Sequence, residues 1–297
     1  MKERWIMFKG SMVAIITPFK KGKVDEKKLA ELVEFHIKNS TSAIVPCGTT
    51  GESSTLSYEE HERVIDVVIE AVNKRVPVIA GTGSNNTAEA IMLTTHAKNA
   101  GADASLQISP YYNRPTQEGL YQHFKKIAEE SGLPLIVYNI ASRTGVNILP
   151  ETMQRLSRVK NIIGVKEASG NLDQMSQIHE LCGEKFELIS GDDSLTLPLL
   201  SIGGTGVISV VANIAPKDVA DMVSKFNKGD ITGARKLHYK LLPLVRAIFI
   251  ETNPIPVKTA MALMGLIDES TLRLPMCAIS DENLTKLKKA LKEYGLL

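Results

Sequence analysis

Ile162-Ile163-Gly164-Val165 is a run of four apolar residues that ends at Lys166. A run this short and this uniformly apolar is typical of a strand covered on both faces, as in a parallel sheet. Seven further runs of this kind lie at residues 12–16, 43–45, 76–80, 104–108, 134–138, 186–189 and 206–210. The sequence therefore predicts eight buried strands.

Amphipathic segments with helix start and stop signals lie between these runs. Ser57 and Glu60 form a capping box, Thr116 predicts a helix start, and Gly132 predicts the end of that helix. A strand is followed by a helix eight times by about residue 227. This order most economically closes into an α/β (β/α)8 TIM barrel. A doubly wound open sheet is the alternative, but it usually carries a recognisable nucleotide-binding loop.

The last part of the chain has a different pattern. Residues from about 230 onward carry only helical periodicity. We therefore expect a TIM barrel catalytic domain over residues 1–229 and a C-terminal helical extension over residues 230–297.

Composition argues against several classes of protein. The 297 residues carry a net charge of +2, with 43% hydrophobic and 23% charged residues, which suits a soluble enzyme better than a nucleic-acid binder. The basic run at residues 286–289 is interpreted as the solvated face of the last helix. The uncharged stretch at residues 194–216 contains proline and several glycines, so we interpret it as a buried helix and strand and expect no membrane span.

Cofactor and compartment signals are also sparse. The three cysteines, Cys47, Cys182 and Cys277, are widely spaced, and the start of the chain is too polar for a signal peptide, so a cytoplasmic protein is expected. The histidines lack zinc-ligand spacing, and no Walker, complete G-x-G-x-x-G or G-x-S-x-G motif occurs. We expect no metal.

Lys166 is the strongest candidate for chemistry. At the carboxyl end of a buried strand it would stand at the mouth of the barrel, where active sites of this fold lie. Burial disfavours an ammonium and lowers its pKa, which favours the neutral amine that attacks carbonyl groups. The alternative is a surface lysine paired with Glu167.

Polar residues follow other predicted strands. Gly48-Thr49-Thr50-Gly51-Glu52-Ser53 could hold a small carboxylate through hydroxyls and amides, or could simply cap the next helix. Tyr138 could relay a proton and Arg143 could bind a carboxylate through its planar guanidinium, although a strand-end tyrosine is often only packing. Tyr111 and Tyr112 could belong to the core or to an interface.

Together these segments resemble the dihydrodipicolinate synthase family of pyruvate-dependent class I aldolase-type enzymes. The resemblance runs from Gly10 through the helical tail. Its most specific parts are Gly48-Thr49-Thr50-Gly51-Glu52-Ser53, Pro110-Tyr111-Tyr112-Asn113-Arg114-Pro115, Tyr138-Asn139 with Arg143-Thr144-Gly145, and Gly164-Val165-Lys166-Glu167.

The resemblance implies that Lys166 forms a Schiff base with pyruvate and that no separate cofactor is needed. Tyr138, Thr49 and Tyr112 would relay protons, with Tyr112 reaching in from a neighbouring subunit. A homotetramer built as a dimer of dimers is implied.

The resemblance also implies how substrates are held. Thr50 would bind the carboxylate of pyruvate and Arg143 that of L-aspartate 4-semialdehyde, while the backbone at Gly191 and Ile208 would line the pocket. The product, 4-hydroxy-tetrahydrodipicolinate, belongs to lysine (diaminopimelate) biosynthesis. Related lyases of sialic or keto-deoxy sugar acids, and a non-catalytic pyruvate-binding regulatory barrel, are the alternatives.

Lysine-sensitive members of this family have a lysine pocket at a subunit interface. Tyr58 and Ser54 depart from the pattern of those members, and a polar interface cleft is the alternative. The matching positions in this chain are Ser53, Ser54, Tyr58, His61, Asn85, Glu89 and Tyr111.

Overall fold

The structure, a computed structural model, describes residues 8–297. An eight-stranded parallel sheet forms its centre, in the spatial order β4-β1-β10-β9-β8-β7-β6-β5. A parallel bridge between Ile44 and Val78 joins the two ends of this order and closes the barrel. The strands are β1 Gly10–Ala14, β4 Ala43–Val45, β5 Ile79–Gly81, β6 Ala104–Ile108, β7 Leu135–Asn139, β8 Ile162–Glu167, β9 Glu187–Ser190 and β10 Gly206–Ser209.

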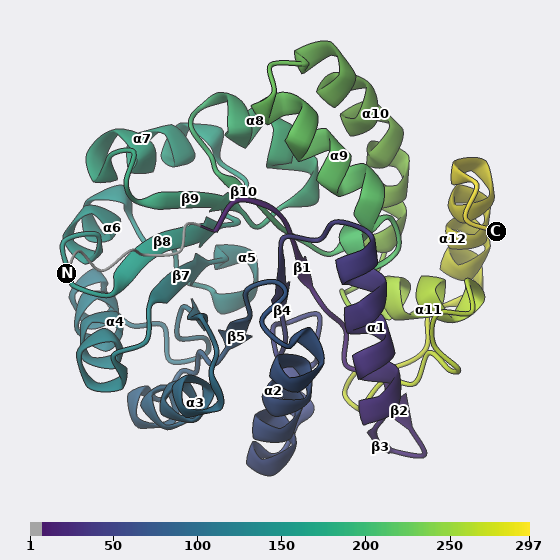
Figure 1. Ribbon diagram of the computed structural model, residues 1–297. Coiled ribbons are helices and arrows are strands. Elements are labelled where there is room, and N and C mark those ends of the chain that lie inside the picture. Colours follow the sequence, from purple (N-terminus) through teal and green to yellow (C-terminus); the bar gives the residue numbers. More distant parts are fainter. Residues whose placement is uncertain (1–7) are drawn as a thin grey trace.

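Helices surround the strands, as Figure 1 shows, so the predicted (β/α)8 barrel is confirmed. Each of the eight barrel strands is followed by at least one helix before the next barrel strand begins, and the last of these helices, α9, ends at Asn227. The helices are α1 Glu26–Lys38, α2 Tyr58–Val72, α3 Thr87–Ala100, α4 Gln117–Ser131, α5 Ala141–Thr144, α6 Pro150–Leu156, α7 Leu172–Cys182, α8 Thr196–Ser201 and α9 Pro216–Asn227. Three short 3-10 helices lie at Ser53–Thr55, Asp193–Leu195 and Val211–Asn213.

The predicted helix signals act as expected. Ser57 and Glu60 form both hydrogen bonds of a capping box, at 3.2 and 3.1 Å, at the start of α2. The Thr116 hydroxyl caps α4, which ends at Gly132 in the left-handed conformation that glycine adopts without strain. The segment at residues 194–216 contains α8 and β10, in agreement with its interpretation as a buried helix and strand.

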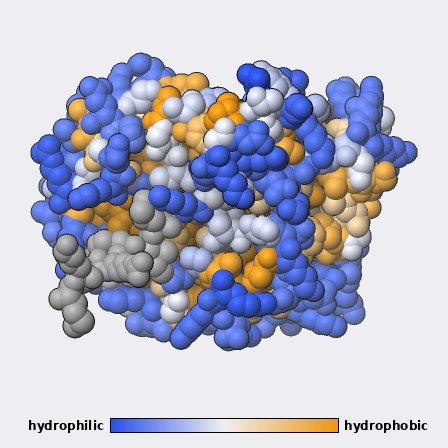
Figure 2. Space-filling view, turned by 45° about the horizontal axis from the view of Figure 1, so that its top comes forward, coloured by the Kyte–Doolittle hydropathy of each residue, from blue (hydrophilic) through white to orange (hydrophobic). Residues whose placement is uncertain are grey.

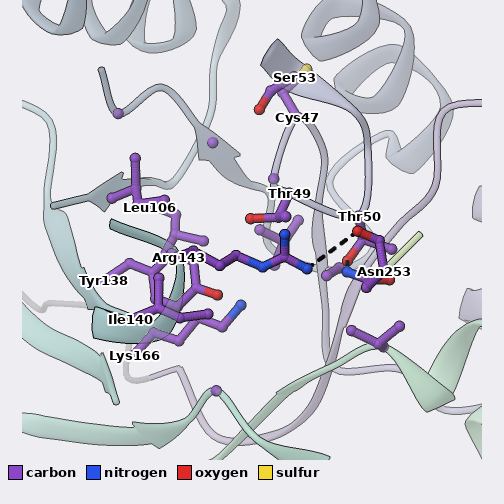
Figure 3. Close-up of a pocket in the computed structure, with 18 of the residues that line it drawn as sticks. Cys47, Thr49, Thr50, Ser53, Leu106, Tyr138, Ile140, Arg143, Lys166 and Asn253 are labelled. Atoms are coloured by element: carbon purple, nitrogen blue, oxygen red, sulfur yellow. Dashed lines mark hydrogen bonds between the residues drawn. The ribbon is translucent and has the colours of Figure 1, made fainter. Parts of the chain in front are cut away.

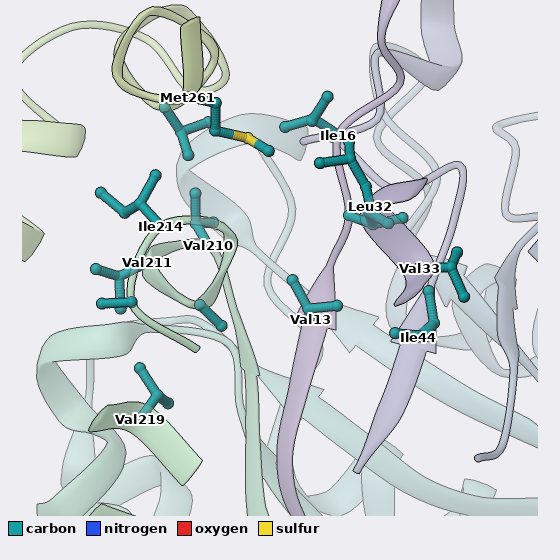
Figure 4. Close-up of a cluster of buried hydrophobic side chains, with 14 of the residues drawn as sticks. Val13, Ile16, Leu32, Val33, Ile44, Val210, Val211, Ile214, Val219 and Met261 are labelled. Carbon is teal, nitrogen blue, oxygen red and sulfur yellow. The ribbon is translucent and has the colours of Figure 1, made fainter. Parts of the chain in front are cut away.

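Three helices complete the chain: α10 Ile231–Ile248, α11 Ile255–Leu263 and α12 Asp281–Tyr294. They form the helical extension that the periodicity predicts. Figure 4 shows Met261 of α11 in one buried cluster with Val13 of β1 and Ile44 of β4, so the extension packs directly on the outer face of the barrel. A fully buried aliphatic side chain of this kind contributes about 1.5–3 kcal/mol. The division at residue 229 remains a prediction.

A hairpin after β1 was not predicted. Its strands are β2 Phe19–Lys20 and β3 Lys23–Val24, which pair antiparallel. Lys21 and Gly22 form the turn with positive φ angles of 51° and 77°. Two-residue strands are too short to give a periodic signal.

Alternation along the strands places the candidate residues. Side chains at successive strand positions point to opposite faces, so Ile136 and Tyr138 face the barrel interior while Val137 packs under the outer helices. Tyr138 pairs in register with Lys166 on the next strand. Both residues lie near the carboxyl ends of their strands, at the mouth of the barrel.

The surface gives no sign of a membrane span. Within residues 8–297, no helix is long and apolar enough to cross a bilayer. Figure 2 shows a mostly hydrophilic face with separate apolar patches. The expectation that the chain start is not a signal peptide concerns residues outside the described part.

Candidate active site

A pocket of about 90 Å³ lies at the mouth of the barrel. Figure 3 shows Lys166 and Tyr138 on one side of it, Thr49 and Thr50 on another, and Arg143 extending between them. These five residues come from β8, β7, the loop after β4 and α5. The fold therefore brings together most of the residues that the sequence indicates, across more than 100 positions of the chain.

Lys166 is buried, with 5% of its surface exposed. It does not pair with Glu167, whose carboxylate instead accepts hydrogen bonds from Asn139 and the Ser169 amide. The Lys166 Nζ atom lies 4.1 Å from the centre of the Tyr138 ring. The pKa of Lys166 is lowered to about 7 by burial, which outweighs the raising effect of the Asp193 charge and is assisted by the Arg143 charge. A large fraction of this amine is therefore neutral and nucleophilic near pH 7.

Tyr138 is also buried, at 5% exposure. Burial raises the pKa of its hydroxyl to about 12, against the lowering effects of the Arg143 charge and a hydrogen bond with Thr49. The phenol is therefore protonated at neutral pH, and it can donate one proton and accept another. The Tyr138 and Thr49 side chains line the same pocket as the Lys166 amine, so their hydroxyls are suited to moving protons.

The loop that carries Thr50 is held by residues far away in the chain. Thr50 is buried, and the side-chain amide of Asn253 donates a 3.0 Å hydrogen bond to its hydroxyl oxygen. Arg143 donates from Nη2 to the backbone carbonyl of the same Asn253, at 3.2 Å. Asn253 lies between α10 and α11, in a segment for which the sequence predicts only helices.

Gly191 lines the pocket, as the resemblance implies. A Cβ atom at this position would lie 2.7 Å from the Ala168 Cβ and 3.1 Å from the Lys166 Cε. Glycine therefore leaves the room that the lysine side chain occupies. Ile208 does not line the pocket. It is buried in the barrel interior, and Val210 forms the wall near the end of β10.

Asp193 is a buried carboxylate that sequence reasoning missed. It accepts hydrogen bonds from the amides of Val210 and Val211, and from the Ser209 hydroxyl. Burial raises its pKa. Its position just after β9 was the available signal, because the carboxyl ends of barrel strands meet at the site; Asp193 does not line the pocket, but its charge acts on Lys166.

Tyr112 lies apart from the other candidates in the single chain. Its side chain is 92% exposed, its φ angle is +69°, and it does not line the pocket. A tyrosine that packs within its own barrel would be buried, so the exposure of this ring argues against that alternative. The left-handed backbone at Tyr112 is also uncommon for a residue other than glycine. Its neighbour Tyr111 is 38% exposed and borders a second cavity.

This second cavity has a volume of about 570 Å³ and adjoins the first. Thr49, Ser53, Arg143 and Asn253 line both. Of the seven predicted regulatory residues, six line the second cavity: Ser53, Ser54, Tyr58, His61, Glu89 and Tyr111. Asn85 does not line it, but its side chain donates to the Tyr111 carbonyl at 3.1 Å.

Groups within this second cavity are already partly paired. Glu89 accepts a 2.8 Å hydrogen bond from Ser84, and its negative charge raises the pKa of Tyr58. His61 bonds to the Gly81 carbonyl at 2.7 Å, and burial lowers the pKa of its ring. The cavity lining therefore includes three glutamates, Glu52, Glu59 and Glu89, together with the Arg143 guanidinium and several neutral polar groups.

No metal cluster is found among the described residues. Within residues 8–297, no group of three or more histidine, cysteine, aspartate or glutamate side chains is placed to hold a metal ion.

The fold and the pocket together define a class. A buried lysine without a carboxylate hydrogen bond, inside a (β/α)8 barrel and beside a protonated tyrosine, is suited to lyases that form a Schiff base with a carbonyl substrate. The model of the "Dihydrodipicolinate synthetase family" matches residues 7–294. The chain belongs to this family.

Individual relatives match nearly the whole chain. The 4-hydroxy-tetrahydrodipicolinate synthase of Thermodesulfovibrio yellowstonii is 60% identical, over 98% of this chain and 100% of that protein. The chloride-inhibited dihydrodipicolinate synthase of Acinetobacter baumannii, solved in complex with pyruvate, is 48% identical with a TM-score of 0.95, over 98% and 100% of the two chains. A structure described as the first monomeric dihydrodipicolinate synthase variant is 44% identical with a TM-score of 0.95, over 98% of each chain.

Proposed function

We propose that this chain is a lyase that condenses pyruvate with L-aspartate 4-semialdehyde to give 4-hydroxy-tetrahydrodipicolinate, in lysine biosynthesis. The observation that carries the proposal is Lys166, which is buried in the pocket with its pKa lowered to about 7. The 60% identity to a named 4-hydroxy-tetrahydrodipicolinate synthase over its whole length supports the same reaction. A soluble biosynthetic enzyme with three unpaired cysteines fits the cytoplasm.

The chemistry begins at the Lys166 amine. The neutral amine attacks the pyruvate ketone, and loss of water gives an iminium ion that is covalently bound to the enzyme. Loss of a proton from the pyruvate methyl group then gives an enamine, which attacks the aldehyde carbon of the second substrate and restores the iminium. The amino group of the second substrate then attacks the iminium carbon, which closes the ring and releases Lys166 as the free amine. No cofactor beyond this covalent linkage is needed.

The other pocket residues have distinct proposed roles. Tyr138 and Thr49 move protons during iminium formation, because both line the pocket beside the Lys166 amine. Thr50 donates to the pyruvate carboxylate. Arg143, exposed at the mouth, binds the carboxylate of the incoming aldehyde through its planar guanidinium. Gly191 keeps the space beside Lys166 open.

Product identification tests this function. Purified protein with both substrates should consume each in equal amounts and release 4-hydroxy-tetrahydrodipicolinate. Turnover of sialic or keto-deoxy sugar acids in place of the aldehyde would favour a related pyruvate lyase. Schiff-base trapping by borohydride without turnover of any of these substrates would favour a pyruvate-binding regulator.

We also propose that Tyr112 completes the proton relay of a neighbouring subunit, within a homotetramer built from two such dimers. Its 92% exposure in the single chain supports this role, since aromatic residues are enriched in interface cores. Because one structural neighbour is described as a monomeric variant, the oligomeric state of this chain has to be measured.

A mixing experiment tests this assembly. Lys166→Ala and Tyr112→Phe proteins, each impaired, are dissociated and reassembled together. If Tyr112 acts across the interface, mixed dimers contain one site with both groups, and activity rises above that of either parent. No recovery, with subunit exchange confirmed by mass, would contradict the proposal.

The second cavity is proposed as a lysine site. Its lining offers Glu89 for an ammonium group and Tyr111 to pack on an aliphatic stem. Calorimetric titration with lysine tests the idea, and Glu89→Gln should weaken binding because it removes the carboxylate charge. No heat of binding at millimolar lysine would exclude it and leave the cavity as a polar interface cleft.

A further inference from the structure

Asn253 touches both proposed substrate-binding groups from outside the eight βα units. It is 5% exposed and lies between α10 and α11, 203 residues from Thr50. Its side chain bonds to Thr50 and its backbone carbonyl accepts from Arg143. One residue of the helical extension thus contacts the group proposed for each of the two carboxylates.

The direction of the Asn253–Thr50 hydrogen bond matters for binding. A carboxylate can only accept hydrogen bonds, so Thr50 can bind pyruvate only by donating its single hydroxyl proton. The Asn253 Nδ2 atom donates to Thr50 Oγ1 at 3.0 Å, which leaves that proton free. If the amide oxygen faced Thr50 instead, the Thr50 hydroxyl would donate its hydrogen bond to Asn253 and could not donate to pyruvate.

Burial alone does not choose between these two orientations. The Asn253 Oδ1 atom has no hydrogen-bond partner among residues 8–297. Turning the amide over would place Nδ2 at the same unpaired position, so either orientation leaves one buried polar atom unsatisfied. The demand that Thr50 act as a donor is what selects the orientation in which Nδ2 faces it.

We infer that Asn253 is a positioning residue for pyruvate: its amide donates to Thr50 and so directs the Thr50 proton to the pyruvate carboxylate. This inference rests on the proposed function. The contact to Arg143 uses the backbone carbonyl, which every replacement of the side chain retains. Side-chain variants should therefore change pyruvate binding and spare the aldehyde.

Two variants of Asn253 separate polarity from packing. Asn253→Asp has nearly the same size but, as a carboxylate, only accepts hydrogen bonds, so the Thr50 hydroxyl would donate to it instead of to pyruvate. Asn253→Ala removes the bond. Pyruvate binding is measured as the pyruvate concentration that gives half-maximal borohydride labelling of Lys166, and aldehyde use as its KM at saturating pyruvate.

We expect the half-saturating pyruvate concentration to rise by about tenfold in Asn253→Ala, the effect of one lost hydrogen bond of about 1.4 kcal/mol. Asn253→Asp should raise it at least as much, which a role in packing alone would not produce. In Asn253→Ala the aldehyde KM should stay within about twofold, because the backbone carbonyl that Arg143 contacts is retained. If Asn253→Ala fails to fold, Asn253→Asp carries the test alone.

A double-mutant cycle with Thr50→Val completes the experiment. Once the hydroxyl is gone, Asn253→Ala should add less than about twofold to the half-saturating concentration, because its target is absent. Effects that multiply in the double variant, or an unchanged half-saturating concentration in Asn253→Asp, would overturn the role of Asn253. Absence of any label on wild-type Lys166 would instead overturn the proposed function.

Discussion

Two lysines are buried within residues 8–297, and their surroundings differ. Lys258, at 0% exposure, lies in α11 and donates to three acceptors: Glu52 at 2.7 Å, the Thr17 carbonyl at 3.0 Å and the Thr271 carbonyl at 2.6 Å. Lys166, at 5% exposure, has no hydrogen-bond acceptor for its amine among residues 8–297 and faces the pocket. Burial lowers the pKa of both lysines, and Glu52 opposes that shift for Lys258.

This difference shows that burial does not by itself make a lysine reactive. Three acceptors at hydrogen-bond distance require the three N–H groups of an ammonium ion, so Lys258 is held in its charged form. Lys166 has no such acceptors, and its neutral form is favoured. Lys258 joins the helical extension to the Thr50 loop through Glu52, while Lys166 is free to attack a carbonyl.

The largest expected effect is the loss of Lys166. Lys166→Ala should abolish the pyruvate label and lower turnover by about 10³-fold or more, since the nucleophile is removed. Mass spectrometry of borohydride-treated protein should find a reduced pyruvyl group on the wild-type peptide that carries Lys166. Lys258→Met is the control, and its folded fraction should still carry the label. A reduced pyruvyl group on a residue other than Lys166 would contradict the assignment of Lys166 as the nucleophile.

Lys258 should matter for stability instead. Lys258→Met leaves the Glu52 carboxylate buried without its partner, which we expect to cost about 3–5 kcal/mol in the free energy of unfolding. Urea denaturation measures this cost. The double variant Lys258→Met/Glu52→Gln should recover part of the loss, and Lys217→Met in an exposed ion pair should change little. A variant as stable as the wild type would show that the buried pair is not structural.

The sequence predicted one of these lysines and not the other, for a physical reason. Lys166 ends an apolar strand, and the carboxyl ends of barrel strands meet in one place, so its location follows from local pattern. Lys258 and Asn253 lie in or beside helices of the extension, and their partners Glu52 and Thr50 are about 200 positions away. Nothing in local periodicity encodes such contacts.

The apolar runs also predict where strands lie more accurately than where they begin. The runs at 43–45 and 104–108 match β4 and β6, whereas the run at 76–80 begins three residues before β5. Apolar residues before a strand are buried too, so hydrophobicity alone does not mark where pairing begins. The backbone pairing is decided by neighbouring strands, which the periodicity does not report.

Arg143 sharpens the comparison because its charge acts on Lys166 and not on Lys258. Arg143→Ala should raise the KM for aspartate semialdehyde, with a loss of about 1.5–3 kcal/mol for a charge-assisted pair. Pyruvate labelling at high pH, where Lys166 is neutral in either protein, should change much less. Steady-state kinetics and borohydride labelling measure the two steps separately. Equal damage to both would indicate a general structural role.

The smallest expected effect is a shift in pH dependence. The rate of pyruvate labelling should rise with pH and level off above about 7, because only neutral Lys166 attacks and its pKa is lowered to about 7. Arg143→Ala removes a positive charge that lowers this pKa, so the midpoint should move up. Asp193→Asn removes a negative charge that raises it, so the midpoint should move down.

The free energy of unfolding should also depend on the lowered pKa of Lys166. Unfolded Lys166 titrates near 10.5 and folded Lys166 near 7, so the unfolded chain binds more protons between these values. The contribution of this residue to stability therefore rises with pH from about 7 to 10.5, and Lys166→Met should flatten that part of the curve. Urea unfolding at pH 6, 8 and 10 measures it. If the stability of Lys166→Met and of the wild type changed identically with pH, the buried Lys166 amine would keep its proton above pH 7. Lys166 would then be a charged buried lysine like Lys258.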